Sequence, residues 1–276
     1  MRHTLNLLHC VLVILVSAGY LFMAGCSGQS DDNTIVGEES FALDLAALYS
    51  EVTSIAVQVA FEPDAEPFTG TVINETQCWE VLEENIQALF AGRIIEPDIF
   101  VPRDSTEMVQ IPAQGEETWT AAEIMDLAGS IWDRPRGFSA EDFYVLFLNG
   151  YLEKDGEENP QVIGASVVGT PVMVVFKDAI LRASNSLTVL MFVEQATLVH
   201  EFGHVMGLVD NGIPMVSDHL DPDHPRHCTN EECVMYWQNE GAADLREFVQ
   251  QMMSTGSLVM FGEECLDDTM SYMPGG

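Results

Sequence analysis

A short segment near residue 200 constrains this chain more than any other part of its sequence. His200 and His204 stand four residues apart, and Glu201 lies between them. If the segment is helical, this spacing places both imidazoles on one face, about one turn apart. Residues 192–208 are apolar around most of the helical circumference, which is typical of a helix buried in a core. The pattern therefore predicts a core helix that carries three ionisable side chains.

Three buried ionisable groups need a partner, because burial of an unpaired polar group costs roughly 2–7 kcal/mol. One zinc ion meets that need, since His200 and His204 would supply two of its usual four ligands. Glu201 lies near the same face but is turned away from direct ligation, so it can take a proton from a water that the metal activates. This division of roles is that of zinc metalloproteases with an HExxH helix. The spacing thus indicates one catalytic zinc ion, with Glu201 as the general base.

The residues that follow add a turn and a second segment with metal-binding side chains. Gly207 stands three residues after His204, where glycine can take the positive φ that ends a helix and reverses the chain. Farther along comes a compact group of histidine, cysteine and methionine residues: His227, Cys228, Cys233 and Met235.

Together these segments resemble the metzincin clan of zinc metallopeptidases, whose pattern is HExxHxxG, a third ligand, and later a methionine in a tight turn beneath the zinc. Residues 227–235 read H-C-x4-C-x-M and are similar to the archaemetzincin branch, in which the third histidine directly precedes the first cysteine. The resemblance covers residues 200–235. It implies His200, His204 and His227 as zinc ligands, with Met235 as the methionine of the turn.

The third ligand has several candidates. In the compact family pattern it stands where this chain has Asp210, and carboxylate oxygen is an acceptable zinc donor. His227 follows an insertion, which leishmanolysin-like metzincins tolerate at this place. We rank His227 first, Asp210 second, and His219 or His224 third.

The same inserted loop carries three aspartates, Asp218, Asp221 and Asp223. Carboxylate oxygens are the ligands that calcium prefers. The alternative to a catalytic role for this loop is therefore a solvated segment that binds calcium.

The amino terminus predicts export. Residues 1–25 begin with a short basic stretch, continue with an apolar run, and end in small residues before Cys26. These features describe a secretory signal, and they resemble a bacterial lipoprotein signal in which Cys26 is lipidated. We divide the chain into a signal at 1–25, a polar tether at 26–50 and a metallopeptidase domain at 51–276. The expected location is the outer membrane or cell surface, with the lipid on Cys26 as the membrane contact.

The chain has six cysteines, of which Cys10 would leave with the signal and Cys26 would carry lipid. The remaining even set suits disulfides in an exported protein. Archaemetzincins carry a later CxxC that helps to hold a structural zinc, whereas this chain has one cysteine after Met235, so a disulfide is the favoured interpretation. The predicted pairs are Cys228 with Cys233 and Cys78 with Cys265.

Composition limits the size of the body and the kind of partner. A hydrophobic content of 47% favours a globular body, and the length allows one good-sized domain after the signal and tether. The 10 Lys+Arg and 44 Asp+Glu residues give a formal net charge of −34 at pH 7. Such a surface repels nucleic acid, which we therefore do not expect as a partner. The sequence does not predict an oligomeric state.

Hydrophobic periodicity predicts an α+β order of elements. Strands are expected at residues 55–61, 143–148, 162–168 and 172–176, with helices at 79–90, from Thr120, at 192–208 and from about Leu245. The resemblance implies a metzincin-like zincin fold, with a mixed sheet packed on the HExxH helix, a Met-turn and a C-terminal helix. It makes residues 164–168 the candidate edge strand for an extended peptide.

These features indicate a lipid-anchored zinc endopeptidase that acts on peptide or protein substrates. The alternative is a non-catalytic zinc- or calcium-binding surface lipoprotein that serves as a binding module. Glu201 favours the enzyme, because a purely structural zinc site does not require a base there. A third hypothesis is hydrolysis of a non-peptide amide.

Overall fold

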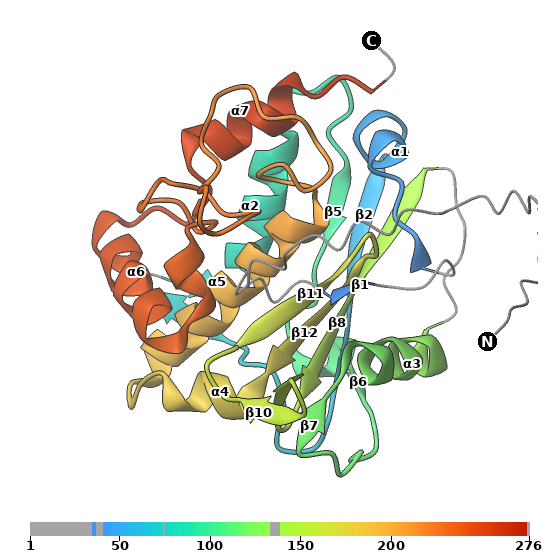
Figure 1. Ribbon diagram of the computed structural model, residues 1–276, viewed down its shortest axis with the longest axis vertical. Coiled ribbons are helices and arrows are strands. Elements are labelled where there is room, and N and C mark those ends of the chain that lie inside the picture. The colour runs from blue at the N-terminus through green and yellow to red at the C-terminus, as the bar shows by residue number, and fades with distance from the viewer. Residues whose placement is uncertain (1–34, 37–40, 74, 133–138, 275–276) are drawn as a thin grey trace, which may run out of the picture.

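The computed structural model describes residues 35–36, 41–73, 75–132 and 139–274 (Figure 1). Its helices, in chain order, are α1 (Leu45–Ser50), α2 (Glu80–Phe90), the 3₁₀ helix η2 (Ser105–Glu107), α3 (Ala121–Ile131), α4 (Lys177–Arg182), α5 (Leu187–Val205), the 3₁₀ helix η3 (Trp237–Glu240), α6 (Ala242–Thr255) and α7 (Glu263–Ser271). Its strands are β1 (Ile35–Val36), β2 (Ser54–Phe61), β3 (Thr71–Ile73), β4 (Thr76–Gln77), β5 (Asp98–Phe100), β6 (Val109–Gln110), β7 (Thr118–Trp119), β8 (Ala140–Leu148), β9 (Tyr151–Lys154), β10 (Glu157–Asn159), β11 (Gly164–Val168) and β12 (Val172–Phe176).

The main sheet is mixed, as the α+β prediction requires. Its strand order is β1-β11-β12-β8-β2-β5, and β6 also pairs with β2. Strands β12, β8, β2 and β5 form parallel pairs, whereas β11 runs antiparallel to β12. Every residue of β12 is buried, which explains why its sequence is a continuous apolar run. The predicted strands at 55–61, 143–148 and 172–176 all lie in this sheet, and the fourth begins at Gly164.

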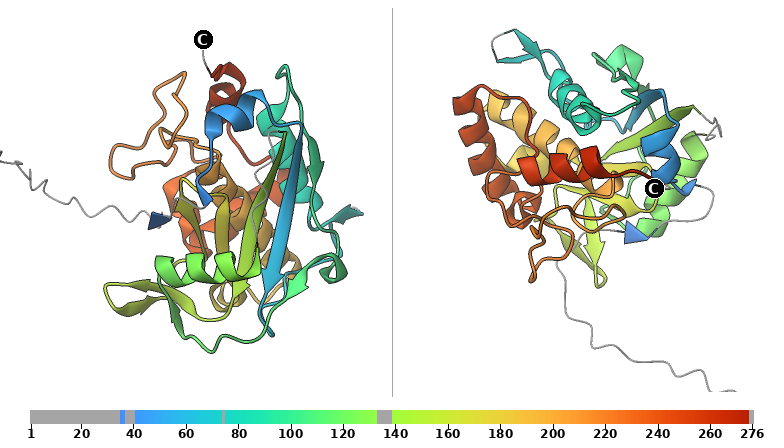
Figure 2. Two further views of the ribbon diagram at one scale, coloured as in Figure 1. Left: turned by 90° about the vertical axis from the view of Figure 1, so that its right-hand side faces the viewer. Right: turned by 90° about the horizontal axis from the view of Figure 1, so that it is seen from above.

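Helix α5 is the central support of one face of the sheet. It packs against β11 and β12, with α2 and α6 beside it (Figures 1 and 2). Phe202 on α5 meets Phe143 on β8 with ring centroids 4.6 Å apart. Full burial of a large apolar side chain stabilises a fold by about 1.5–3 kcal/mol, so aromatic contacts of this kind fix the helix firmly on the sheet.

Helix α3 lies against the opposite face (Figure 1). The predicted capping box opens it: Thr120 Oγ1 accepts a hydrogen bond from the backbone N–H of Glu123, and Glu123 Oε2 accepts one from the N–H of Thr120. These bonds satisfy two backbone donors that a helix start leaves without partners. The buried side of α3 is formed by Ile124, Met125 and Ala128.

The predicted boundary of the folded domain at residue 51 is wrong. Phe41, Leu48 and Tyr49 are buried in the core, and Asp44 caps α1. The Tyr49 hydroxyl also donates to the carbonyl of Met206, at the end of α5, over 3.1 Å. Residues 41–50 therefore belong to the body, because their apolar side chains cover the end of α5. The predicted signal at 1–25 and the lipidation site Cys26 lie outside the described residues.

The predicted C-terminal helix is present as α6, but α7 follows it. Helix α7 was missed because its sequence, EECLDDTMS, has no apolar face of the usual kind. Its buried residues are Cys265, Asp268 and Thr269, so polar and sulfur atoms anchor it to the body.

The expected edge strand is not the outermost one. Strand β1 pairs in parallel with the end of β11, placing Ile35 opposite Val167 and Val36 opposite Val168. Within the described ranges, no strand pairs with the outer side of β11 between Gly164 and Ser166. The earlier half of β11 therefore has no strand partner on its outer side among the described residues, although Gly164, Ala165 and Ser166 are buried.

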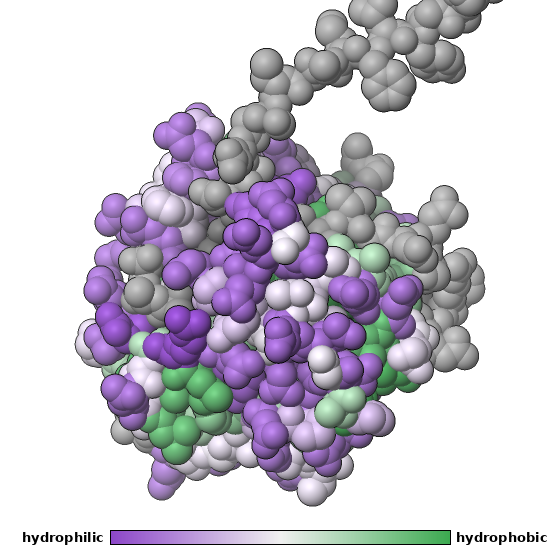
Figure 3. All heavy atoms as spheres, turned by 60° about the horizontal axis from the view of Figure 1, so that its bottom comes forward, coloured by the Kyte–Doolittle hydropathy of each residue, from purple (hydrophilic) through white to green (hydrophobic). Residues whose placement is uncertain are grey.

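The molecular surface reflects the acidic composition. On the face shown in Figure 3, hydrophilic side chains predominate and hydrophobic ones gather in small separate areas. None of the helices in the described part of the chain has both the length and the apolar character that a bilayer crossing requires.

Candidate metal centre

Helix α5 carries His200, Glu201 and His204 inside the protein. From Val189 to its end, every residue of this helix is buried. The sequence showed this in advance, because a helix with apolar residues around most of its circumference has no side that favours water. The helix ends as predicted, with Gly207 at a φ of +81°.

Three imidazoles converge at this place. Nε2 of His204 lies 3.1 Å from Nε2 of His200. The ring of His227 lies with its centroid 5.4 Å from that of His200 and 5.0 Å from that of His204. One ligand atom from each of the three lies within 4.8 Å of the others. Two nitrogens bound to a tetrahedral zinc at about 2.0–2.1 Å are themselves about 3.3 Å apart, so the spacing fits that ion.

The other candidates for the third ligand are elsewhere. Asp210 is exposed and is not part of the histidine cluster. His224 stacks on Trp237, with ring centroids 3.8 Å apart and an interplanar angle of 4°. His219 contacts Cys228 and belongs to a second group of side chains.

Backbone carbonyls orient two of the three imidazoles. Nδ1 of His200 donates to the carbonyl of Val234 over 2.7 Å, and Nδ1 of His227 donates to that of Pro225 over 3.0 Å. A proton held on Nδ1 leaves the lone pair on Nε2, the atom that faces the cluster. Neither carbonyl was identifiable from the sequence, because each depends on how a distant loop folds.

The electrostatics of the centre favour neutral imidazoles. Burial lowers the pKa of His200 to about 3, with a further lowering from His227 and an opposing effect of the hydrogen bond to Val234. Burial, followed by the nearby His200 and His227, also holds the pKa of His204 well below its usual value. Both rings are thus unprotonated near neutral pH, as metal ligation requires.

Met235, the methionine that the resemblance assigns to the turn, lies directly against α5. It is fully buried, and a Cβ atom added to Gly203 would overlap its Sδ. Gly203 stands between the two helical histidines in the sequence, so the methionine packs on the segment of helix that carries them. The turn is held by a hydrogen bond of 2.8 Å from the N–H of Cys228 to the carbonyl of Met235.

Glu201 is buried on the side of α5 that faces β11. A Cβ atom added to Gly164 would lie 3.2 Å from Cγ of Glu201 and 2.5 Å from Cγ2 of Thr197. Only glycine therefore lets the strand pass this closely over the helix. The contact brings the unpaired part of β11 next to the carboxylate that we expect to act as the base.

The acidic loop is organised by its own backbone. Asp221 Oδ1 accepts hydrogen bonds from the N–H groups of Asp223 and His224, and Asp218 is exposed. Among the described residues, these aspartates do not form a cluster with the spacing of metal ligands. The geometry gives no support to the calcium alternative.

Both predicted disulfides are wrong, since all four described cysteines are free. The sulfur of Cys265 lies 3.6 Å from that of Cys233, whereas a disulfide requires about 2.05 Å. Cys78 is buried at a different place, with its sulfur 4.0 Å from the carbonyl of Met191 on α5. The pairing failed because α7, which apolar periodicity does not reveal, carries Cys265 to the loop at 228–233. The sequence did contain one signal of this helix. Residues three apart share a helix face, and Cys265 and Asp268 have this spacing.

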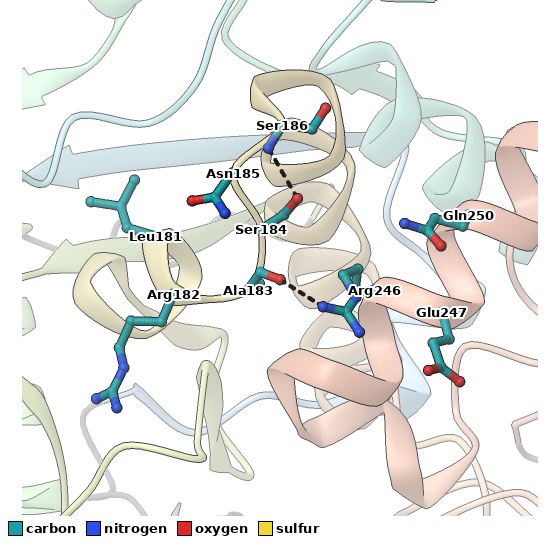
Figure 4. Close-up of a pocket in the computed structure, with 9 residues that line it drawn as sticks. All are labelled: Leu181, Arg182, Ala183, Ser184, Asn185, Ser186, Arg246, Glu247 and Gln250. Atoms are coloured by element: carbon teal, nitrogen blue, oxygen red, sulfur yellow. Dashed lines mark hydrogen bonds between the residues drawn. The ribbon is translucent and has the colours of Figure 1, made fainter.

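A surface hollow of about 990 Å³ lies between α4, the start of α5 and α6 (Figure 4). It is lined by polar groups such as Arg246, which donates to the carbonyl of Ala183. None of the clustered histidines lines it, so this hollow is separate from the metal centre.

Comparisons with known proteins give little further identification. No family model matches the chain, and no curated protein matches it significantly. Among solved structures, the chain is similar to the crystal structure of a zinc-dependent peptidase from Methanocorpusculum labreanum strain Z. The identity is 13%, the TM-score is 0.43, and the match covers 77% of this chain and 99% of that chain. A likeness this distant assigns neither a fold family nor an activity.

Proposed function

We propose that this protein is a zinc-dependent endopeptidase, with His200, His204 and His227 as zinc ligands and Glu201 as general base. The observation that carries the proposal is the convergence of three buried imidazoles whose ligand atoms lie within 4.8 Å of one another. Their neutral state and the carbonyl groups behind two of them fit a divalent cation.

A zinc ion held there would polarise a peptide carbonyl and lower the pKa of a water molecule towards about 7. Glu201 accepts the proton of that water while its oxygen forms a bond to the carbonyl carbon. Glu201 then delivers the proton to the nitrogen as the C–N bond breaks, so that a carboxylic acid and an amine leave. The burial of Glu201 keeps bulk water from competing for this proton.

The substrate that we propose is an extended peptide lying along β11. Such a peptide pairs with exposed backbone groups of a sheet edge. The part of β11 near Gly164 has no strand partner on its outer side among the described residues and passes close to Glu201, so a peptide that displaces its cover can pair there. A non-peptide amide has no extended backbone that could pair with this strand, which is why we favour a peptide.

The location that we propose follows from the amino terminus. The basic, apolar and small-residue order before Cys26 supports an exported lipoprotein whose peptidase domain faces the outside of the cell.

Cleavage of an unstructured protein by wild type and by Glu201→Gln tests the proposal. Loss of the general base should lower kcat by about 10²- to 10⁴-fold and leave the zinc content unchanged. If both proteins bind zinc and neither cleaves, a binding module replaces the peptidase.

The third ligand is tested by His227→Ala and the matched control Asp210→Ala. The first should lose the zinc of this centre together with activity, and the second should keep both because Asp210 is exposed. The reverse result would make Asp210 the ligand.

A further inference from the structure

A second group of metal-binding side chains lies beside the histidine centre. Nδ1 of His219 is 3.3 Å from the sulfur of Cys228. One ring nitrogen of His219 and the sulfurs of Cys228 and Cys265 lie within 4.8 Å of one another. Cys233 joins them through its contact of 3.6 Å with Cys265. All four side chains are buried. We propose that His219, Cys228, Cys233 and Cys265 bind a second, structural zinc ion.

The number, type and spacing of the donors fit zinc. Structural zinc sites are closed, with four tetrahedral ligands that are commonly three cysteines and one histidine. Sulfurs bound to one zinc at about 2.3 Å lie about 3.8 Å from each other. The separation of 3.6 Å between Cys233 and Cys265 is close to that value.

The surroundings of the four side chains supply the contacts that zinc ligands need. Nε2 of His219 donates to Oδ2 of Asp268 over 2.8 Å, which leaves Nδ1 to face the sulfurs. Asp268 is itself fully buried, so its carboxylate serves this histidine and the N–H of Val216. A carboxylate behind a ligating histidine is the usual support of a zinc site.

Backbone N–H groups point at two of the sulfurs. The N–H of Asn230 lies 3.4 Å from the sulfur of Cys228, and that of Gly262 lies 3.1 Å from the sulfur of Cys233. Hydrogen bonds to sulfur stabilise the thiolate, which is the form that binds metal.

A reactive cysteine is the other use of a Cys–His–Asp arrangement, because histidine can activate a thiol. The burial of Cys228 argues against it, since an enclosed sulfur cannot reach a substrate. Two further sulfurs in the group have no role in such a mechanism, whereas a zinc ion uses all of them.

The second ion would also position the first centre. Cys228 directly follows His227, and Cys233 directly precedes Val234, whose carbonyl orients His200. A metal bond on each side would fix this stretch of loop against α7. This positioning role rests on the proposed function, whereas the binding of the second ion does not.

Zinc content of the purified full chain tests the site. Wild type should hold two zinc ions per chain, and Cys265→Ser and His200→Ala should each hold one. Cys78→Ala is the control, since Cys78 is a buried cysteine outside the group and its loss should leave two ions. In Cys265→Ser the remaining zinc should dissociate about 10- to 100-fold more readily, as after loss of an outer support.

X-ray absorption at the zinc edge keeps the test decisive if Cys265→Ser does not fold. His200→Ala leaves all four proposed ligands intact, and its zinc should show sulfur neighbours at about 2.3 Å. Zinc with only nitrogen and oxygen neighbours, a Cys233–Cys265 disulfide in the unreduced protein, or rapid alkylation of Cys228 in the zinc-loaded protein would each overturn the proposal. Zinc bound to sulfur without peptide cleavage would refute the peptidase alone.

Discussion

The two proposed metal-binding groups meet at one peptide bond, between His227 and Cys228, yet they are built in different ways. In the first, a single helix positions His200 and His204, and the loop adds one ligand. In the second, the donors come from two turns of the loop and from α7, and no element of secondary structure holds more than one of them. The first group therefore takes two of its three donors from one helix, whereas the second takes its donors from separate segments, one of which is α7.

This difference suggests a division of labour. A site with three protein ligands leaves a position open for substrate, while a site with four is closed and contributes to folding. The loop at 219–233 has little regular structure of its own, so we expect the second ion to hold it.

Metal removal should have the largest effect. A chelator should take the ion of the open histidine centre first and abolish peptidase activity with little change in the melting temperature. Later loss of the closed, sulfur-bound ion should unfold the loop and α7, since structural zinc binding contributes about 10–16 kcal/mol in zinc-finger peptides at pH 7. Activity and thermal melting, followed over time, check the order. Simultaneous loss of activity and stability would mean that the two ions act as one unit.

Gly203→Ala should affect both groups, because the added methyl overlaps Met235 in the turn between them. Overpacking of this kind costs about 1–3 kcal/mol, and displacement of the turn should also move the carbonyl of Val234 away from His200. We expect reduced stability in urea and reduced activity.

Gly164→Ala is the matched change on the other side of α5, where the added methyl meets Thr197 and Glu201 instead. It should lower kcat and leave the content of both zinc ions unchanged. Equal effects of the two glycine changes on metal content would show that Met235 has no special relation to the histidines.

Some features of this molecule follow directly from its sequence. The helix α5 and its three functional side chains follow from helical spacing and apolar residues within one segment. Strand β12 was equally clear, since a strand buried on both faces has a continuous apolar sequence. In each case the information is local.

The missed features depend on contacts between distant segments. Helix α7 has a polar sequence, and its burial makes sense only beside the loop that carries His219 and Cys228. The disulfide prediction failed for the same reason, because the spacing of cysteines does not show which side chains α7 brings together. Residues 41–50 were assigned to the tether because their packing partner, the end of α5, is far away in sequence.

Asp268→Asn should weaken metal binding in the second group alone, and by less than complete removal of the metal. The amide keeps the size of the side chain but weakens the support of His219. Loss of such an outer contact typically reduces metal affinity by about 10- to 100-fold, here only for the second ion. Competition with a chromophoric chelator measures both ions. Equal weakening of the histidine centre would indicate that Asp268 supports the whole region rather than the sulfur site.

Thr120→Ala should have the smallest effect on the two metal-binding groups, because α3 lies on the opposite face of the sheet from α5 (Figure 1). Loss of an N-cap costs about 1 kcal/mol, and both zinc ions and the activity should be unchanged.

Hydrogen bonds from the Thr120 side chain and then its backbone lower the pKa of Glu123. A lowered carboxyl pKa stabilises the fold above the ordinary glutamate pKa, and that contribution is lost as the pH falls through the lowered value. The difference in unfolding free energy between wild type and variant should therefore be constant near neutral pH and shrink in acid. A difference that grows in acid would show that the capping box does not hold the ionised carboxylate.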